Sequence, residues 1–319
     1  SKVSPGCANC YAETLTKRYA KAWGVPGLPW TPANAEQNVI VKHERLDQPL
    51  RWKKPRMVFV NSMSDLFHER LTGLPDPQGK SFPRRQNEPP RPDFIAEVFA
   101  VMSIATQHTF QVLTKRPRAM QALLTHPNFW LQVNAARLRR HHHVLPGAAP
   151  FILPNVWLGT SIENRRFVDR ADLLRETPAA VRFISAEPLL GPLMHETDIG
   201  MYNDCSCSTH PCEHPKRKGD IYASCWSDAF EGPELDLTDI DWLIVGGESG
   251  PGHRPMNVEW VRNLRDETRC EYHMIMDQRE PCPSGTHFFF KQWGGATPKS
   301  GGRELDGRTW DEMPAVRTP

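Results

Sequence analysis

The sequence contains no run of about 18 apolar residues and no signal-peptide pattern, so it predicts neither a membrane-spanning helix nor export. Net charge is nearly absent too, because 39 Lys and Arg residues face 37 Asp and Glu residues and leave a formal charge of +2. So small a charge excludes a general electrostatic attraction to nucleic acid, and any basic surface must be local. We expect a soluble, cytoplasmic protein without a membrane partner.

Apolar residues are somewhat scarce at 39%, yet a chain of 319 residues can still bury the core of a large α/β domain. The 30 prolines point to long surface loops around that core. Eight cysteines in a reducing compartment suggest metal ligands or buried thiols before they suggest disulfides.

Short runs rich in β-branched and aromatic residues alternate with amphipathic helical patterns. The predicted strands are Met57–Asn61, Phe110–Thr114, Val156–Thr160, Val181–Ser185, Trp242–Gly246 and His287–Lys291. The predicted helices are Tyr11–Trp23, Asp93–Thr106, Arg118–Leu124, Arg166–Glu176 and Val258–Thr268. Asn164 and Asn257 are the expected N-caps of the last two helices. Strict alternation predicts a parallel sheet, either open or closed into a barrel.

Every predicted strand is followed by polar residues that can take part in chemistry. In parallel α/β folds the carboxyl ends of the strands gather on one edge, where ligands bind. The candidates at this edge are Ser62, Ser64, Asp65, Lys115, Arg116, Glu163, Glu187, Glu248 and Lys291. Helix caps and solvated loops would explain many of these residues singly, but they do not readily explain all six strand ends at once.

Three segments interrupt the alternation, and we expect them to be insertions within one domain that spans residues 1–319. They are the proline-rich segment 75–92, the basic segment 131–150 and the cysteine-rich segment 200–234. The basic segment contains Arg137, Arg139 and Arg140 next to three histidines, and it could contact phosphates. A solvated helix face is the ordinary alternative for such a run.

Two groups of cysteines have a spacing that suits metal binding. Cys7 and Cys10 form a C-x2-C pair in a glycine-bearing loop before a predicted helix. Such a pair fits half of a zinc site, a redox dithiol, or two ligands of an iron–sulfur cluster. The second group consists of Cys205, Cys207, Cys212 and Cys225. Four thiols are enough for a structural zinc site, although their irregular spacing also fits incidental free thiols.

Eight motifs follow one another in a family-like order, among them PGCANCYAE, NSMSDLFHE, NVWLGTSIEN, RFISAEPLLGP and DWLIVGGESGPGHRP. On these motifs the chain resembles the phage Gp37/Gp68 family, which is also catalogued as a domain of unknown function. That family resembles radical S-adenosylmethionine enzymes. The resemblance implies an α/β fold of the partial (β/α)6 TIM-like barrel type, a 4Fe-4S cluster on three cysteines, and S-adenosylmethionine bound to the iron left open.

The resemblance also implies roles for the candidate residues. Cys7 and Cys10 would be two of the three cluster ligands, and we expect the third immediately before Ser1, in a longer protein. The residues that would bind the cofactor are Ser62, Ser64, Asp65, Lys115 and Arg116, where a helix N-cap is the alternative role of Asp65. The residues that would act on the substrate are Glu163, Glu187, Glu248 and Lys291. An electron donor such as a flavodoxin or a ferredoxin would be a partner.

A distant likeness to the radical lyase that repairs spore DNA photoproducts implies a nucleic-acid substrate, DNA or RNA. A base would have to leave the duplex to meet the radical. Trp30, Trp52 or Trp293 would stack on that base. The arginines that would hold phosphates are Arg84, Arg85, Arg137, Arg139 and Arg140.

Two other functions stay open at this point. The first is a catalytically idle barrel that contains zinc at Cys205–Cys225 and binds nucleic acid or a ribonucleoprotein. The second is a metal-free hydrolase or transferase that uses the carboxylates at the strand ends, with Cys7 and Cys10 as a redox pair. The sequence contains no recognisable nucleophile–base pair or phosphate-binding loop for the second function.

Overall fold

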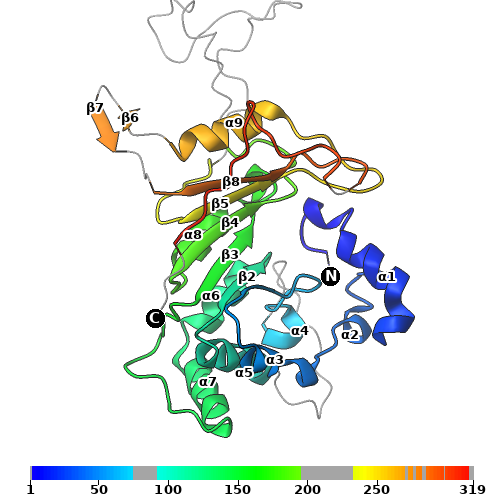
Figure 1. Cartoon of the computed structure of the whole chain (residues 1–319), viewed down its shortest axis with the longest axis vertical. Coiled ribbons are helices and arrows are strands. Elements are labelled where there is room, and N and C mark those ends of the chain that lie inside the picture. Colours follow the sequence, from blue (N-terminus) through cyan, green and yellow to red (C-terminus); the bar gives the residue numbers. More distant parts are fainter. Residues whose placement is uncertain are drawn as a thin grey trace, which may run out of the picture.

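The centre of the molecule is a curved sheet of six parallel strands, which forms half of a barrel (Figure 1). The computed structural model describes residues 2–74, 92–194, 233–269, 272–275, 278–281, 285–297 and 299–315. The strand order is β1-β2-β3-β4-β5-β8. The strands are β1 (Met57–Val60), β2 (Thr109–Thr114), β3 (Val156–Ser161), β4 (Val181–Ala186), β5 (Trp242–Gly246) and β8 (His287–Gln292). The α/β fold with a parallel sheet is thereby confirmed.

Helices precede and connect the strands, with α1 (Tyr11–Trp23) to one side of the sheet (Figure 1). The other longer helices are α5 (Pro92–Ile104), α6 (Pro117–Leu124), α7 (Pro127–Arg139), α8 (Asp169–Arg175) and α9 (Val258–Glu267). The short elements are η1 (Pro5–Cys7), α2 (Ala35–Asn38), η2 (His43–Arg45), α3 (Gln48–Arg51), α4 (Glu69–Thr72) and η3 (Arg165–Phe167). Two further strands, β6 (Tyr272–Ile275) and β7 (Gln278–Pro281), pair as an antiparallel hairpin.

Alternation along the strands divides the apolar side chains between two clusters. Residues such as Val112 and Leu158 point outward and join the main core with the helices. Trp157, Phe183 and Trp242 belong to a second, inner cluster. Within it the ring centroid of Trp242 lies 5.9 Å from those of Trp157 and Phe183. With both faces packed in this way, the strands are near-continuous apolar runs, as parallel strands usually are.

The six predicted strands are all confirmed, and their ends differ from the prediction by at most one residue. The predicted N-cap Asn257 of α9 is confirmed, whereas Asn164 caps the short helix η3 and α8 begins separately after Val168. The Asn164 side chain accepts a hydrogen bond from the Arg166 N–H, and Asn257 accepts one from the Glu259 N–H. Among the described helices, none is long and apolar enough to cross a membrane.

The basic segment 131–150 differs from the expected insertion, because its first nine residues belong to α7. Trp130 and Val133 of α7 are buried, and Trp130 meets the Phe99 ring of α5 edge to face at 6.0 Å. The alternation of strands and helices concealed this core helix, because α7 follows α6 with no strand between them. The other two expected insertions fall almost entirely on residues 75–91 and 195–232, outside the described residues.

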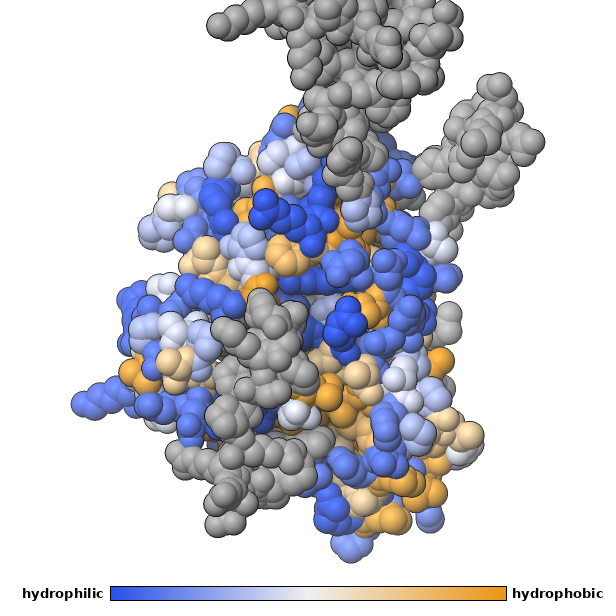
Figure 2. Space-filling model, turned by 180° about the vertical axis from the view of Figure 1, so that it is seen from behind, coloured by the Kyte–Doolittle hydropathy of each residue, from blue (hydrophilic) through white to orange (hydrophobic). Residues whose placement is uncertain are grey.

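Exposed apolar side chains occur on α7 as well as buried ones. The surface is mostly hydrophilic, with apolar side chains gathered towards the end of the molecule where α7 lies (Figure 2). Leu131 is 66% exposed on this helix, whereas Val133 is 0% exposed. The two residues therefore offer a direct comparison between the outer and the core-facing side of one helix.

We predict that Val133→Ala lowers the free energy of unfolding by about 2 kcal/mol, because it removes buried methyl groups from a packed core. Leu131→Ala on the same helix should change it by no more than about 0.5 kcal/mol. Urea unfolding followed by far-UV circular dichroism measures both values. Equal losses in the two variants would contradict the placement of α7 in the core.

Candidate functional site

The loop with the two N-terminal thiols lies against the carboxyl edge of the sheet, and we call residues 4–10 the thiol loop. The Ser4 hydroxyl donates a 2.6 Å hydrogen bond to Glu163, which follows β3. The Asn9 amide donates a 3.0 Å hydrogen bond to Glu248, which follows β5. Cys7 and Cys10 are half-buried and form no disulfide. The two thiols therefore lie where parallel α/β proteins bind their ligands.

Glu163 is the most deeply buried group of this edge, with an exposed fraction of 0%. Besides Ser4, its carboxylate is paired with the Lys115 ammonium and, at 3.3 Å, with the Arg170 guanidinium. Arg170 also donates a 2.7 Å hydrogen bond to the Ser161 carbonyl. Burial lowers the pKa of Arg170, and the Glu163 charge opposes that shift. Glu163 thus joins the ends of β2 and β3 to the thiol loop.

Glu248 is held in a similar way by the loop that follows β5. The Arg254 side chain donates hydrogen bonds of 2.9 and 2.5 Å to its two oxygens, and the Arg254 backbone N–H donates another of 2.9 Å. The guanidinium also donates to the Pro5 carbonyl at 3.1 Å. Burial alone would raise the pKa of Glu248, but the hydrogen bonds from Arg254 and Asn9 bring it below its usual value.

A second buried cluster surrounds Asp65. One carboxylate oxygen of Asp65 accepts hydrogen bonds from the Thr114 hydroxyl at 2.7 Å and from the Phe67 N–H at 3.0 Å. The other oxygen accepts from the Lys115 N–H at 3.2 Å and from the Arg116 guanidinium at 3.0 Å. Burial raises the pKa of Asp65, but Arg116 and these hydrogen bonds outweigh it and lower the pKa. The bond from the Phe67 N–H closes a turn before α4, and the N-cap of α4 is His68, so the alternative role of Asp65 as a helix N-cap is wrong.

Arg116 connects this cluster to α4. Its Nε–H donates a 2.6 Å hydrogen bond to Glu69, and its exposed fraction is 5%. His68, the N-cap of α4, accepts a 3.3 Å hydrogen bond from the Arg70 N–H through Nδ1. Burial, together with the nearby Arg116 charge, lowers the pKa of His68 to about 3. His68 is therefore neutral in the folded protein at neutral pH.

The remaining candidates lie in more open positions of the same edge. Glu187 and Lys291 form a 2.8 Å ion pair, with 22% and 51% of their side chains exposed. Ser62 and Ser64 are exposed after β1. The Tyr11 hydroxyl donates to the Ser62 carbonyl at 2.8 Å. Burial raises the pKa of Tyr11, and the neighbouring Cys10 and Glu187 raise it further.

The candidates thus divide into three groups. The first group holds the thiol loop: Glu163 and Glu248 bind it, and Lys115 binds Glu163. The second is the buried pair of Asp65 and Arg116. The third is the ion pair of Glu187 and Lys291. Among the described residues, no three His, Cys, Asp or Glu side chains come together as a metal site. The candidate zinc ligands Cys205, Cys207, Cys212 and Cys225 lie outside the described residues.

Four residues of the site were missed by the sequence. Ser4 and Asn9 bind carboxylates that lie 159 and 239 positions further along the chain. No spacing rule relates such distant partners, although both residues flank the cysteines. Arg170 belongs to a helix and Arg254 to a loop, and arginines in such places are usually exposed to solvent. Their residue type alone therefore did not indicate that they bind buried carboxylates.

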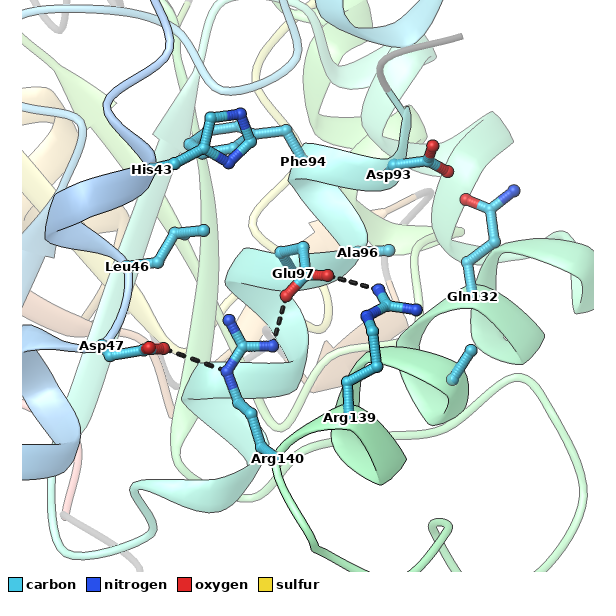
Figure 3. Close-up of a pocket in the computed structure, with 11 residues that line it drawn as sticks. His43, Leu46, Asp47, Asp93, Phe94, Ala96, Glu97, Gln132, Arg139 and Arg140 are labelled. Carbon is cyan, nitrogen blue, oxygen red and sulfur yellow. Dashed lines mark hydrogen bonds and ion pairs between the residues drawn. The ribbon is translucent and has the colours of Figure 1, made fainter. Parts of the chain in front are cut away.

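Of the five arginines expected to hold phosphates, Arg84 and Arg85 lie outside the described residues, and the other three are paired within the protein. Figure 3 shows Arg139 and Arg140. Arg139 and Arg140 both bind Glu97, and Arg140 also binds Asp47 at 3.0 Å. They line a cavity of about 720 Å³ between η2, α5 and α7. Arg137 donates instead to the Ser103 hydroxyl at 2.5 Å. Because carboxylates already neutralise Arg139 and Arg140, the local excess of positive charge expected from the sequence is much reduced.

We predict that His68 makes the stability of the protein fall as the pH drops below about 6.5, its ordinary pKa in the unfolded chain. Only the unfolded chain binds the proton between that pH and about 3, so the free energy of unfolding decreases through this window. The loss attributable to His68 should reach about 2 kcal/mol between pH 7 and pH 5.

The variant His68→Asn serves as the comparison, because an asparagine oxygen can still cap α4 but does not titrate in this range. Urea unfolding at pH 7, 6 and 5 should show a shallower decrease for the variant than for the unmodified protein. Parallel curves for the two proteins would mean that His68 does not carry this pH dependence.

Comparisons with curated proteins and with solved structures found no match. A family model described as "Protein of unknown function (DUF5131)" matches residues 1–76 and 87–314. These ranges include the thiol loop, the carboxyl-edge residues and all six strands of the parallel sheet. The chain therefore belongs to the DUF5131 family of proteins of unknown function.

Proposed function

We propose that this protein is a radical S-adenosylmethionine enzyme that modifies or repairs a base of a nucleic acid. One observation carries the proposal: Cys7 and Cys10 lie on a loop held against the carboxyl edge of a six-stranded parallel half-barrel. This arrangement suits the partial (β/α)6 TIM-like barrel that the sequence resemblance implies. The reaction class comes from the resemblance to the Gp37/Gp68 family. The position of the two thiols at the carboxyl edge of the sheet is consistent with that class.

The residues of the thiol loop fit a 4Fe-4S cluster in donor type and in position. Cysteine thiolates are the usual ligands of such clusters, and both thiols are half-buried and free of disulfides. The described residues bring no third ligand to these two, so the proposal requires a thiolate from outside the described residues. When bound, the cluster and S-adenosylmethionine would supply a 5′-deoxyadenosyl radical able to take a hydrogen atom from the substrate.

Contacts within the protein narrow the set of residues proposed to bind S-adenosylmethionine. Asp65 and Arg116 are engaged with one another and with their neighbours, so we assign them to the support of the strand ends. Ser62 and Ser64 have exposed side chains on the same loop, and Lys115 is partly exposed beside Glu163. These three residues are the better candidates for hydrogen bonds to the polar groups of the cofactor.

Among the residues proposed to act on the substrate, Glu187 and Lys291 are the most accessible. Their side chains are 22% and 51% exposed, so the ion pair is open to solvent. An exposed carboxylate and ammonium can bind polar groups of a substrate without leaving a buried charge unpaired. Glu163 and Glu248 are engaged by several donors each, which favours a role in holding the thiol loop.

The nucleic-acid substrate rests on the resemblance, and the structure limits where it could bind. Trp52 packs against His108 and lies under the Arg56 guanidinium, while the Trp293 indole donates to the Glu304 carbonyl at 2.7 Å. Both rings therefore have partners within the protein. We place the contact with nucleic acid at the carboxyl edge, where Lys291 is half exposed, rather than at the paired arginines of α7.

We predict that the anaerobically reconstituted full-length protein binds about four irons and four sulfides per chain. It should release 5′-deoxyadenosine from S-adenosylmethionine when a strong reductant replaces the flavodoxin or ferredoxin donor. Cys7→Ser and Cys10→Ser should each lower the iron content and abolish the release. Cys270→Ser, which changes a thiol outside the loop, is the matched control.

Metal analysis of the same preparations separates this function from its alternative. Zinc without iron, with no nucleoside released, would rule out the radical enzyme and favour a catalytically idle barrel that binds nucleic acid through a zinc-containing insertion. Iron without nucleoside release would contradict the radical chemistry alone.

We predict that the protein binds single-stranded oligonucleotides with an affinity that falls steeply between about 50 and 200 mM salt. Lys291→Ala should reduce the slope of log affinity against log salt by about one, as expected for the loss of one phosphate contact. Arg139→Ala changes a residue at the end of α7 that is already paired with Glu97, and it should leave the slope unchanged. Fluorescence anisotropy measures both, and a failure to bind at about 50 mM salt would reject the nucleic-acid substrate.

A further inference from the structure

We infer that Glu163 and Glu248 are positioning residues that hold the thiol loop at the carboxyl edge before any metal or cofactor binds. Each carboxylate follows a different strand of the sheet, and each receives a hydrogen bond from a different end of the loop. This role goes beyond the proposed function, because it holds whatever the two thiols bind.

The burial of Glu163 makes its contact with the loop a strong one. A fully buried carboxylate is costly unless cations and hydrogen-bond donors surround it. Lys115 and Arg170 supply two of these partners from the barrel, and the 2.6 Å hydrogen bond from Ser4 supplies the third. Hydrogen bonds to a charged group are about twice as strong as neutral ones. Ser4 is therefore tied to the barrel by a bond that water replaces poorly.

Gly6 shows how closely the loop approaches this carboxylate. A Cβ atom at Gly6 would lie 2.6 Å from the Glu163 Oε1 atom, which is too close for any side chain. Its neighbour Cys7 can therefore sit directly beside the Glu163 site, with its Sγ atom 3.7 Å from the Ser4 hydroxyl oxygen. The first thiol and the buried carboxylate are thus parts of one packed unit.

Glu248 fixes the other side of the loop. It accepts a hydrogen bond from Asn9, and Arg254 extends from Glu248 to the Pro5 carbonyl. The ties at Ser4 and Asn9 lie on either side of Cys7, and Cys10 follows directly as the N-cap of α1. Fixing the loop at both ends sets the position of both thiols without help from a ligand.

Removing the hydrogen bond of Ser4 or of Asn9 should increase the fraction of time that the thiol loop spends unfolded. Backbone amides inside the loop exchange with solvent only when their hydrogen bonds open. The Cys7 N–H donates to the Ser4 carbonyl at 3.0 Å and the Ala8 N–H to the Pro5 carbonyl at 3.1 Å. Exchange of these two amides therefore reports unfolding of the turn within the loop, which the hydrogen bonds to Glu163 and Glu248 should slow.

The test is hydrogen–deuterium exchange with mass spectrometry on the full chain without metal or cofactor. Glu163→Gln is a poor variant for it, because Lys115 and Arg170 would lose their buried counter-charge and the protein could fail to fold. Ser4→Ala and Asn9→Ala remove each tie from the loop side and leave both carboxylates in place. Each should speed exchange of the thiol-loop peptide about tenfold, the effect of losing one charge-assisted hydrogen bond.

Two matched controls separate positioning from general destabilisation. Ser4→Thr keeps the hydroxyl and should retain slow exchange, and Glu187→Gln alters a carboxylate that makes no hydrogen bond to the loop. The β3 peptide should exchange at the same rate in all variants. Unchanged exchange of the loop in both Ser4→Ala and Asn9→Ala, or faster exchange that spreads to β3, would overturn the inference. Because no cofactor is present, either result is independent of the radical chemistry.

Discussion

The buried charge of Glu163 is the constraint on which the carboxyl edge depends. A carboxylate with 0% exposure must be paired, and its partners come from β2, from α8 and from the N-terminal loop. These three segments are far apart in the sequence, so the carboxylate determines how they meet. The position of the thiols therefore depends on charge pairing at the carboxyl edge as well as on the local turn of the loop.

A second set of charges holds the ends of β1 and β2 together. Asp65 and Arg116 satisfy one another, with Glu69 and Thr114, in a buried cluster between the ends of β1 and β2. The low pKa of His68 results from burial and from the same arginine. The buried ion pairs make this edge rigid, and they occupy most of the lone pairs on the Asp65 oxygens. Binding of a ligand is therefore more favourable at exposed residues such as Glu187 and Lys291.

The sequence predicted the regular part of this structure well. Alternation of apolar runs located all six parallel strands within one residue, because strands buried on both faces leave a strong local signal. It failed at α7, since a helix that follows another helix breaks the alternation. It also placed eight of the nine edge residues correctly after strands, whereas Lys291 lies within β8. It could not distinguish Glu163 from Glu187. Both are glutamates after a strand, and only their burial, which depends on distant partners, separates them.

Because Glu163 is buried and Glu187 is partly exposed, the two carboxylates differ in their access to a ligand. Glu163 has partners for both oxygens and no exposed surface, so a ligand could reach it only by displacing Ser4, Lys115 or Arg170. Among the described residues Glu187 pairs with Lys291, and both side chains remain partly exposed. A polar group of a ligand can therefore contact this pair without displacing a buried partner, whereas contact with Glu163 would leave a buried charge unpaired.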